Sequence, residues 1–281
     1  MQISYSLHKI TDADQFSFCP SSYSKFKYGD DRIAQEFGVL LARGFIDTIL
    51  SKYSLTKQLV VISSPYSFIP TATYALKNYF VYELNKWLSG NNFPVVQETK
   101  IHRTITYKED YGELNAAERL ALIGNDSFHI DKVFLENKTI IFLDDIKITG
   151  SHERMILKMI REYDLQCNRF LVYFAELTDM SIHPNIENYL NYYFVKSIFD
   201  LKHIIKDERF SINTRIVKYI LSADPNLFNV FIQDQSFHFT NLLYNMALGN
   251  CYHMIEAYQV NMNFLKEMIR LNDCKNYRPA V

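Results

Sequence analysis

Two adjacent carboxylates, Asp144 and Asp145, end an apolar run and precede a short segment that contains glycine. The run at 139 to 143 is rich in β-branched and large apolar residues, which indicates a buried strand. The segment after the carboxylates leads into a helix that we expect to begin near Ser151. Because ligands of open parallel sheets bind where the carboxyl end of a strand meets a helix N-terminus, this position predicts a binding site.

The loop before this helix suits a phosphate group. The first turn of a helix offers unpaired backbone N–H groups and the positive end of its dipole, and Gly150 lets the chain approach an anion closely. Thr149 and Ser151 add hydroxyl donors. Asp144 and Asp145 would repel a phosphate, but they can accept hydrogen bonds from sugar hydroxyls or hold a divalent cation through water. A phosphate at one end and a diol at the other describe a ribose 5-phosphate compound.

This stretch resembles the signature of type I phosphoribosyltransferases, in which four apolar residues, two acidic residues, two apolar residues and a Thr/Gly-rich phosphate loop follow one another. The residues that match this order directly are Ile140 to Leu143, Asp144, Asp145, Ile146, Thr149 and Gly150. The resemblance implies that Asp144 and Asp145 face the 2- and 3-hydroxyls of a ribose. It also implies that residues 149 to 152 surround the 5-phosphate.

The resemblance extends more weakly over residues 55 to 200. The stretch SSPYSFIP at 63 to 70 lies where the family has its pyrophosphate loop, so Ser64, Tyr66 and Ser67 are included among the expected ligand-binding residues. An ordinary β-to-α turn explains this stretch equally well. Together with an extended N-terminus and the helical tail sequence at 210 to 221, the pattern is similar to a ComF-like phosphoribosyltransferase group found in tellurite-resistance-associated biosynthetic operons.

The segment departs from the family pattern at three positions. Ile148 stands where purine-salvage members carry an acidic residue that handles the base proton, which argues against the usual purine acceptor. Lys147 takes a position that is usually apolar. His152 stands where a Thr or Ser hydroxyl is usual, and it either donates to the phosphate or points away. The stretch 63 to 70 also contains no Lys or Arg, which weakens the case for pyrophosphate binding there.

Cationic residues elsewhere are candidates for contact with the reacting groups. Arg103 and Lys108 lie where the family carries a mobile loop that closes over the reacting centre and brings cations to the leaving pyrophosphate. A solvated charged face explains them as well. Arg215 and Lys218, on a helix expected at 213 to 223, could reach over the sheet edge toward an acceptor, although an amphipathic helix normally exposes such residues to water.

Strands and helices alternate through the middle of the chain. Strands are predicted at 58 to 64, 95 to 107, 138 to 145, 169 to 177 and 192 to 198. Helices are predicted at 31 to 54, before the first of these strands, and at 72 to 89 and 151 to 163, with a partly helical excursion at 108 to 130. Because the strands are apolar throughout, we expect an α/β fold with a mainly parallel sheet flanked by helices. The resemblance implies that this fold is of the phosphoribosyltransferase-like, Rossmann-like type.

Three parts are predicted along the chain. Residues 1–54 form an N-terminal helical extension that packs on the core, residues 55–200 form the phosphoribosyltransferase-like core, and residues 201–281 form a C-terminal helical region. In that last region, helices are predicted at 213 to 223, 238 to 248 and 261 to 271. With no clear linker before it, the helical region is expected to pack on the sheet domain.

The composition excludes several classes of function. The 281 residues are 48% hydrophobic, which is enough to bury a large core, and the net charge of -1 gives no drive toward nucleic acid or acidic membranes. There is no export signal and no apolar run near the roughly 18 residues that cross a bilayer. The four scattered cysteines suggest neither a zinc site nor disulfides. We therefore expect a cytoplasmic protein, with a homodimer as a possible assembly.

The resulting hypothesis is an enzyme that displaces pyrophosphate from C1 of phosphoribosyl pyrophosphate with an acceptor that the sequence does not identify. Mg²⁺ is the expected cofactor, bridging pyrophosphate and ribose oxygens, and no residues are assigned as dedicated metal ligands. The alternative is a catalytically inactive regulatory module that binds a phosphoribosyl ligand, as Ile148 and the uncharged stretch 63 to 70 suggest. A phosphatase or hydrolase of sugar phosphates that uses the same aspartates is a third hypothesis.

Overall fold

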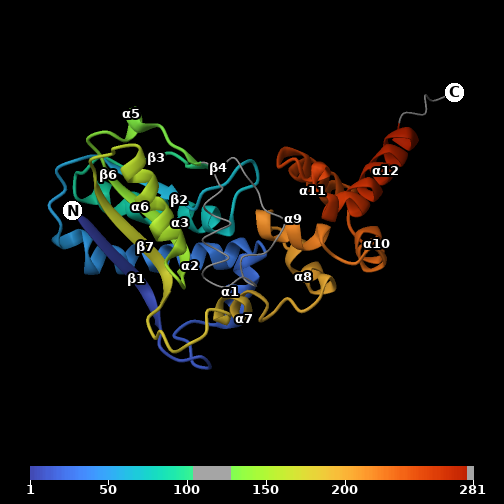
Figure 1. Cartoon of the computed structure of the whole chain (residues 1–281), viewed down its shortest axis with the longest axis horizontal. Coiled ribbons are helices and arrows are strands. Elements are labelled where there is room, and N and C mark those ends of the chain that lie inside the picture. The colour runs from blue at the N-terminus through green and yellow to red at the C-terminus, as the bar shows by residue number, and fades with distance from the viewer. Residues whose placement is uncertain (104–127, 277–281) are drawn as a thin grey trace.

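A five-stranded sheet forms the centre of the computed structural model, which describes residues 1–103 and 128–276 (Figure 1). In spatial order its strands are β1 (Gln2–Ile10), β7 (Asn168–Leu177), β6 (Thr139–Lys147), β2 (Leu59–Ser63) and β3 (Gln97–Glu98). Every neighbouring pair is parallel. A separate antiparallel pair consists of β4 (His102–Arg103) and β5 (Phe128–His129). The predicted parallel sheet is therefore confirmed.

Helices cover both faces of this sheet. Helices α2 (Asp31–Thr48) and α3 (Ala72–Gly90) pack on one face, and α6 (Ser151–Glu162) packs on the other (Figure 1). Alternate residues of β6 enter the two layers, because side chains of a strand point to opposite faces. Ile141 belongs to the core that contains α2 and α3, whereas Ile140 packs with the residues of α6. This two-sided burial explains why β6 is apolar until its acidic end.

Close packing of α2 against α3 depends on a small residue. A Cβ placed on Gly38 would lie 2.5 Å from the carbonyl oxygen of Leu76 and 2.8 Å from Cβ of Tyr79. The two helices can approach this closely only because position 38 has no side chain. At its N-terminus, α2 is capped by the Asp30 side chain, which accepts hydrogen bonds from the backbone N–H groups of Arg32 and Ile33.

The remaining helices lie in two groups. Short helices beside the sheet are α1 (Pro20–Lys27), α5 (Lys132–Leu135) and α7 (Ile186–Asn191), with a 3₁₀ turn at Leu50–Lys52. The C-terminal region contains α8 (Leu201–Ile205), α9 (Thr214–Leu221), α10 (Pro225–Gln233), α11 (Phe237–Gly249) and α12 (Gln259–Asn276). It also contains 3₁₀ turns at Ile198–Asp200, Tyr252–Met254 and Glu256–Tyr258. Within residues 1–103 and 128–276, no helix is both long enough and apolar enough to cross a membrane.

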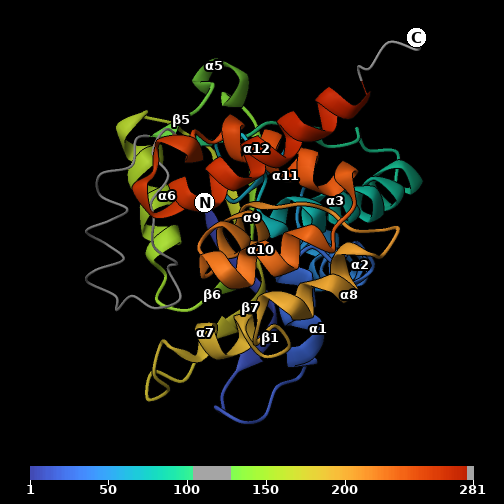
Figure 2. The ribbon, with the colours of Figure 1, turned by 90° about the vertical axis from the view of Figure 1, so that its right-hand side faces the viewer.

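The C-terminal helices, which lie together in Figure 2, have a hydrophobic core of their own. Residues from α8 to α12 form it, and Tyr28 and Ile69 from the earlier part of the chain join it. Helices α9, α11 and α12 confirm the helices predicted near 213, 238 and 261, and the prediction did not include α10. The boundaries at residues 54 and 200 stay predictions.

Two features of the sheet differ from the prediction. Strand β1 was not predicted, although Ile3, Tyr5 and Leu7 alternate along it and pack against the core shared with α2. The strand predicted at 192 to 198 is wrong: these residues form no strand, and Val195 lies fully buried in the second core. An apolar run alone does not distinguish a buried strand from another buried segment.

The predicted second strand is only partly represented. Within 95 to 107 the structure contains the short strands β3 and β4, and residues 104–107 lie outside the described residues. The excursion predicted at 108 to 130 also falls mostly outside them, apart from β5 and the residue that follows it.

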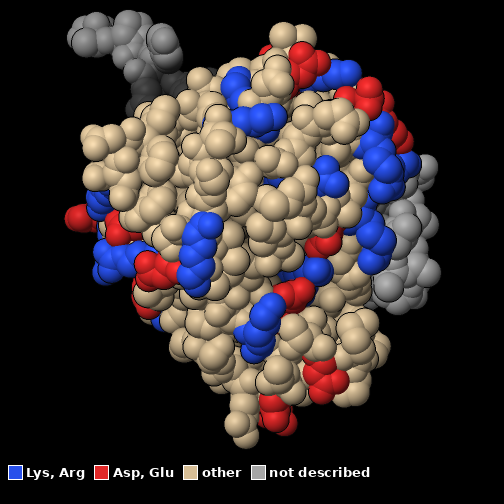
Figure 3. All heavy atoms as spheres, turned by 90° about the vertical axis from the view of Figure 1, so that its left-hand side faces the viewer, with Lys and Arg blue, Asp and Glu red and all other residues tan. Residues whose placement is uncertain are grey.

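Charged side chains of both signs are scattered over the face shown in Figure 3. Uncharged residues occupy most of the area between them. This agrees with a net charge of -1. An anionic ligand therefore has to be bound by a local cluster of charged residues. A cluster of this kind lies at the carboxyl ends of the strands.

Candidate active site

A cavity of about 240 Å³ lies between the carboxyl ends of β2 and β6 on one side and α9 on the other. Its sheet side consists of Ser64, the two aspartates at the end of β6 and the loop that leads into α6. The opposite side consists of residues from α9 together with Tyr192 and Tyr258. The C-terminal helical region therefore completes a site that the sheet begins.

Most of the residues predicted to form the site meet at this cavity. Those that line it are Ser64, Arg103, Asp144, Asp145, Lys147, Thr149, Gly150, Ser151 and His152. Of the described candidates, Tyr66 and Ser67 do not line it: the Tyr66 ring packs edge-on against Tyr74, and the Ser67 carbonyl accepts a hydrogen bond from Lys100 at 3.0 Å. Lys108 lies outside the described residues.

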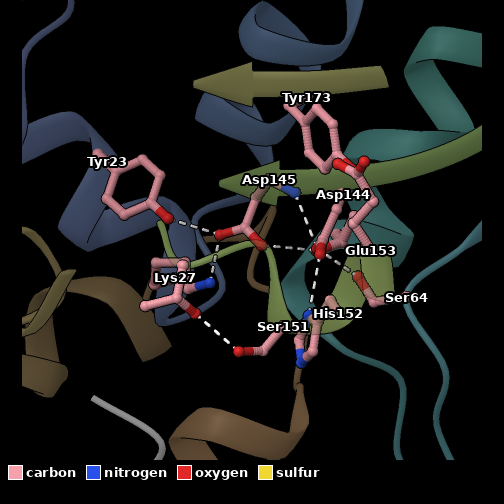
Figure 4. A network of polar contacts seen from close by, with 11 residues as sticks. Tyr23, Lys27, Ser64, Asp144, Asp145, Ser151, His152, Glu153 and Tyr173 are labelled. Atoms are coloured by element: carbon pink, nitrogen blue, oxygen red, sulfur yellow. Dashed lines mark hydrogen bonds and ion pairs between the residues drawn. The ribbon is translucent and has the colours of Figure 1, made fainter. Parts of the chain in front are cut away.

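Asp145 is bound by side chains from two helices that precede the sheet strand in the chain. Its Oδ2 accepts a hydrogen bond from the Tyr23 hydroxyl at 2.6 Å and forms an ion pair with the ammonium group of Lys27, both from α1 (Figure 4). Its Oδ1 accepts a hydrogen bond from Thr73 of α3 at 3.0 Å. The Asp145 carboxylate is therefore held from both sides and its orientation is fixed.

Asp144 is bound by residues of the cavity itself. Its Oδ1 accepts hydrogen bonds from the Ser64 hydroxyl at 2.6 Å and from the backbone N–H of Asp145 at 3.0 Å. Its Oδ2 lies 3.0 Å from Nδ1 of His152, in the first turn of α6 (Figure 4). Ser64 and His152 were both predicted site residues, and the structure places them on the same carboxylate.

These contacts shift the pKa values of the groups involved. Burial alone would raise the pKa of Asp145, but Lys27, followed by the hydrogen bond from Tyr23, holds that pKa well below its usual range. For His152, burial acts to lower the pKa, and the hydrogen bond with Asp144 outweighs it, so the pKa is raised. Burial, and next the charge of Asp145, raises the pKa of Tyr23. At neutral pH, Asp145 is therefore a carboxylate and Tyr23 a neutral donor.

The loop before α6 turns at a glycine and is held by a side chain of the helix that follows. Gly150 has φ of 69°, in the left-handed region that favours glycine. The hydroxyls of Thr149 and Ser151 lie 2.8 Å apart. The guanidinium of Arg154 donates to the Thr149 carbonyl at 2.8 Å and to the Ser151 hydroxyl at 3.0 Å. Arg154 therefore fixes the loop and adds positive charge beside it.

Lys147 is neutralised by two carboxylates. Its ammonium lies 2.7 Å from Glu153 and 3.1 Å from Glu176, and the Tyr173 hydroxyl donates to Glu153 at 3.0 Å. Burial opposes the charge of Lys147, but the hydrogen bond with Glu153, followed by that with Glu176, raises its pKa. Lys147 therefore stays charged, and its charge is balanced within the protein.

Several residues of the site were not found from the sequence. Tyr23, Lys27, Thr73 and Arg154 contact the acidic pair or the phosphate loop, and no motif marks them. Lys27 and Asp145 are 118 positions apart, so no local spacing relates them. The position of Arg154 could have been used to predict its contact, because residues in the first turn of a helix lie close to the loop that precedes the helix.

A parallel sheet covered on both faces, with paired acidic residues and a glycine-containing loop at the carboxyl ends of its strands, defines an α/β protein that binds its ligand at this edge of the sheet, as phosphoribosyltransferases do. A family model described as PRTase ComF-like matches residues 1–265. The chain therefore belongs to the ComF-like phosphoribosyltransferase family, as the sequence predicted. Its association with tellurite-resistance operons stays a prediction.

Solved structures similar to the chain include hypoxanthine phosphoribosyltransferases. The enzyme from Staphylococcus aureus is 11% identical, with 52% of this chain and 75% of that chain covered and a TM-score of 0.33. The hypoxanthine-guanine enzyme of L. donovani is 12% identical, with coverages of 51% and 72% and a TM-score of 0.31. The hypoxanthine phosphoribosyltransferase of Trypanosoma cruzi is 16% identical, with coverages of 54% and 77% and a TM-score of 0.31. The family assignment rests on the family model alone, and no curated protein matches the chain.

Proposed function

We propose that this protein binds phosphoribosyl pyrophosphate in the cavity and transfers its phosphoribosyl group to an acceptor. In that reaction, the bond between C1 and the pyrophosphate oxygen breaks, and its electron pair leaves with pyrophosphate. A lone pair of the acceptor forms the new bond to C1, and any proton on the acceptor atom passes to solvent. The observation that carries the proposal is that the acidic pair and the Gly150 loop of a family member line one cavity.

The residues on the sheet side of the cavity bind and orient the sugar phosphate. The 5-phosphate accepts hydrogen bonds from the first backbone N–H groups of α6 and from the Thr149 hydroxyl, and Arg154 keeps this loop in place. Asp144 accepts hydrogen bonds from the ribose diol. The Asp145 carboxylate is already held by Lys27, so Asp145 serves mainly to fix its neighbours. Its carboxylate positions the ammonium group of Lys27, and its backbone N–H positions the Asp144 carboxylate.

Cations for the leaving pyrophosphate come from outside the stretch 63 to 70, which has none. Lys27 and Arg103 line the cavity from α1 and β4. Positive groups placed where negative charge develops are usually the largest contribution to catalysis of this kind. Because the charge of Lys27 is balanced by Asp145, Arg103 is the candidate for the positive charge that the loop lacks.

Mg²⁺ fits this site as a companion of the substrate. Within residues 1–103 and 128–276, no group of three or more His, Cys, Asp or Glu side chains is placed to hold a metal. Mg²⁺ is commonly bound by one or two carboxylates together with substrate phosphates and water, and Asp144 supplies such a carboxylate. When bound, the ion offsets charge on the pyrophosphate.

Isothermal titration with phosphoribosyl pyrophosphate, with and without Mg²⁺, tests the proposal. We expect Asp144→Asn to weaken binding by about tenfold or more, because it removes a charged acceptor from the diol. Asp47→Asn, on the exposed face of α2, is the matched control and should bind like the parent. Equal affinity of Asp144→Asn and the parent protein would show that the ribose binds elsewhere.

A second function is favoured by the environment of Asp145. Its carboxylate is occupied by Lys27 and Tyr23, which suits a module that binds a phosphoribosyl ligand without turning it over. Incubation of the protein with phosphoribosyl pyrophosphate and a small-molecule cell extract separates the two functions. Pyrophosphate release that Asp144→Asn abolishes supports the enzyme, whereas tight binding without release supports the regulatory module.

A further inference from the structure

Helix α9 has two chemically different faces. Ile216, Val217, Ile220 and Leu221 are fully buried in the core of the C-terminal region. The residues of the other face, together with the one that follows the helix, all line the cavity: Arg215, Lys218, Tyr219 and Ser222. An amphipathic helix normally turns its polar face to water. Here the polar face is one wall of the site.

This wall is fixed to the rest of the site by hydrogen bonds at the start of α9. The backbone N–H of Thr214 donates to the Pro70 carbonyl at 2.8 Å, and its hydroxyl donates to the Ile69 carbonyl at 2.8 Å. The Asn213 side chain donates to the carbonyl of Lys27 at 3.2 Å and caps α9 through the N–H of Ile216. Since Lys27 also binds Asp145, the cationic wall and the acidic floor are held in one arrangement.

Three tyrosines line the cavity together with the cations of α9. The Tyr219 ring packs edge-on against Tyr28 at 5.3 Å and lies 5.8 Å from the ring of Tyr192. Tyr192, Tyr219 and Tyr258 all line the cavity. Tyrosines offer flat apolar surfaces with a hydroxyl at the rim, which suit a planar ring, and Arg and Lys suit a carboxylate. A pyrophosphate would use the cations but would gain nothing from the rings.

We infer that α9 forms the acceptor subsite, and that the acceptor is a planar ring compound that carries a carboxylate bound by Arg215 and Lys218. This inference rests on the proposed function and names the class of its second substrate. The residue at the start of the phosphate loop agrees with it, because Ile148 lines the cavity and cannot act as a base. A ring nitrogen with a free lone pair attacks C1 without losing a proton, so it needs no base at that position.

Ligand-observed NMR on the full chain with ribose 5-phosphate present tests the inference. The probes are benzoate and pyridine-3-carboxylate, each compared with its uncharged amide. We expect the acids to bind more tightly than the amides. We expect Arg215→Gln and Lys218→Gln each to lower the affinity for the acids by about tenfold and to leave the affinity for the amides unchanged. The matched control is Lys266→Gln, because Lys266 is exposed on α12 and does not line the cavity.

The outcomes separate this inference from the proposed function. Acids that bind no better than their amides, or that bind equally well to Arg215→Gln, would overturn the acceptor subsite. Inorganic pyrophosphate serves as a further probe. If Arg215→Gln weakens the binding of pyrophosphate but not that of the acids, α9 binds the leaving group, and the proposed function stands without the inference. Failure of ribose 5-phosphate to bind the parent protein would count against the proposed function, whatever the ring acids do.

Discussion

Lys27 and Asp145, 118 positions apart in the chain, form an ion pair at the floor of the cavity, with side chains 11% and 7% exposed. The second acidic residue of the phosphoribosyltransferase signature thus takes its counter-charge from α1, in the N-terminal part of the chain. A buried ion pair is costly to break, because the partner that remains is an uncompensated charge. The N-terminal segment is therefore part of the site.

Replacing Lys27 tests this pair. Lys27→Met leaves a buried carboxylate without its cation, and we expect the free energy of unfolding at pH 7 to fall by about 3–5 kcal/mol. Denaturant titration measures the change. Lys52→Met, at an exposed position, is the control and should change little. The double variant Lys27→Met/Asp145→Asn should recover part of the loss, and no recovery would mean that Lys27 acts other than through Asp145.

His152 predicts a pH dependence. Its folded pKa is raised above the unfolded value near 6.5, so its contribution to stability is fully present below about pH 6.5 and disappears as the pH rises through the folded pKa. The His152 side chain is 42% exposed, so the contribution stays within about 1 kcal/mol. The difference in Tm between the parent and His152→Gln should therefore be largest at acidic pH.

An NMR titration of the ring checks the cause of that shift. In the parent protein, the pKa of His152 should lie above its usual value, and Asp144→Asn should lower it. An unchanged pKa in Asp144→Asn would show that Asp144 is not what raises it.

Gly150→Ala tests the backbone of the phosphate loop. A Cβ at this position would lie 3.4 Å from Arg154 and 3.7 Å from Lys147, which is ordinary contact, so the backbone alone sets the cost. Because φ is 69°, we expect a loss of about 1–2 kcal/mol. Gly90→Ala is the control: a Cβ there meets nothing within 4 Å, and its φ is not positive. Equal unfolding curves for the two variants would contradict the role of the left-handed turn.

Gly38→Ala tests the contact between α2 and α3. The added methyl would lie 2.5 Å from a backbone carbonyl, so the helices have to move apart. Overpacking of this kind costs about 1–3 kcal/mol, and differential scanning calorimetry should show a lower Tm. A Tm equal to that of the parent would mean that α2 and α3 accommodate the added methyl group without loss of packing.

The local pattern around Asp144 was sufficient to predict the strand, loop and helix of the site. The burial of β6 on both faces shows in its uninterrupted apolar sequence, and Gly150 marks the turn into α6. Strand β1 was harder to recognise, because it alternates polar and apolar residues at the edge of the sheet and pairs with a strand about 167 positions later. Its alternation of Ile3, Tyr5 and Leu7 was the available signal.

Features that depend on tertiary packing could not be predicted. The sequence shows that α9 is amphipathic, but whether Arg215 faces water or a ligand depends on where the core containing Ile216 sits relative to the sheet. The pairing of Lys27 with Asp145 depends on the same packing. The strand predicted at 192 to 198 was wrong because burial in a helical core gives the same apolar sequence as burial in a sheet, and Val195 is buried among helices.

The pairing of β1 with β7 also governs when the protein can fold during its synthesis. The ribosome releases the N-terminus first, yet Gln2 has its sheet partner at Arg169. Residues 2–10 therefore emerge long before the strand they join. The ion pair of Lys27 cannot form until Asp145 has been synthesised, and the hydrogen bond from Asn213 to the Lys27 carbonyl can form only later still. The cavity of a nascent chain therefore has all of its walls only after translation has passed Tyr258, the last residue that lines it.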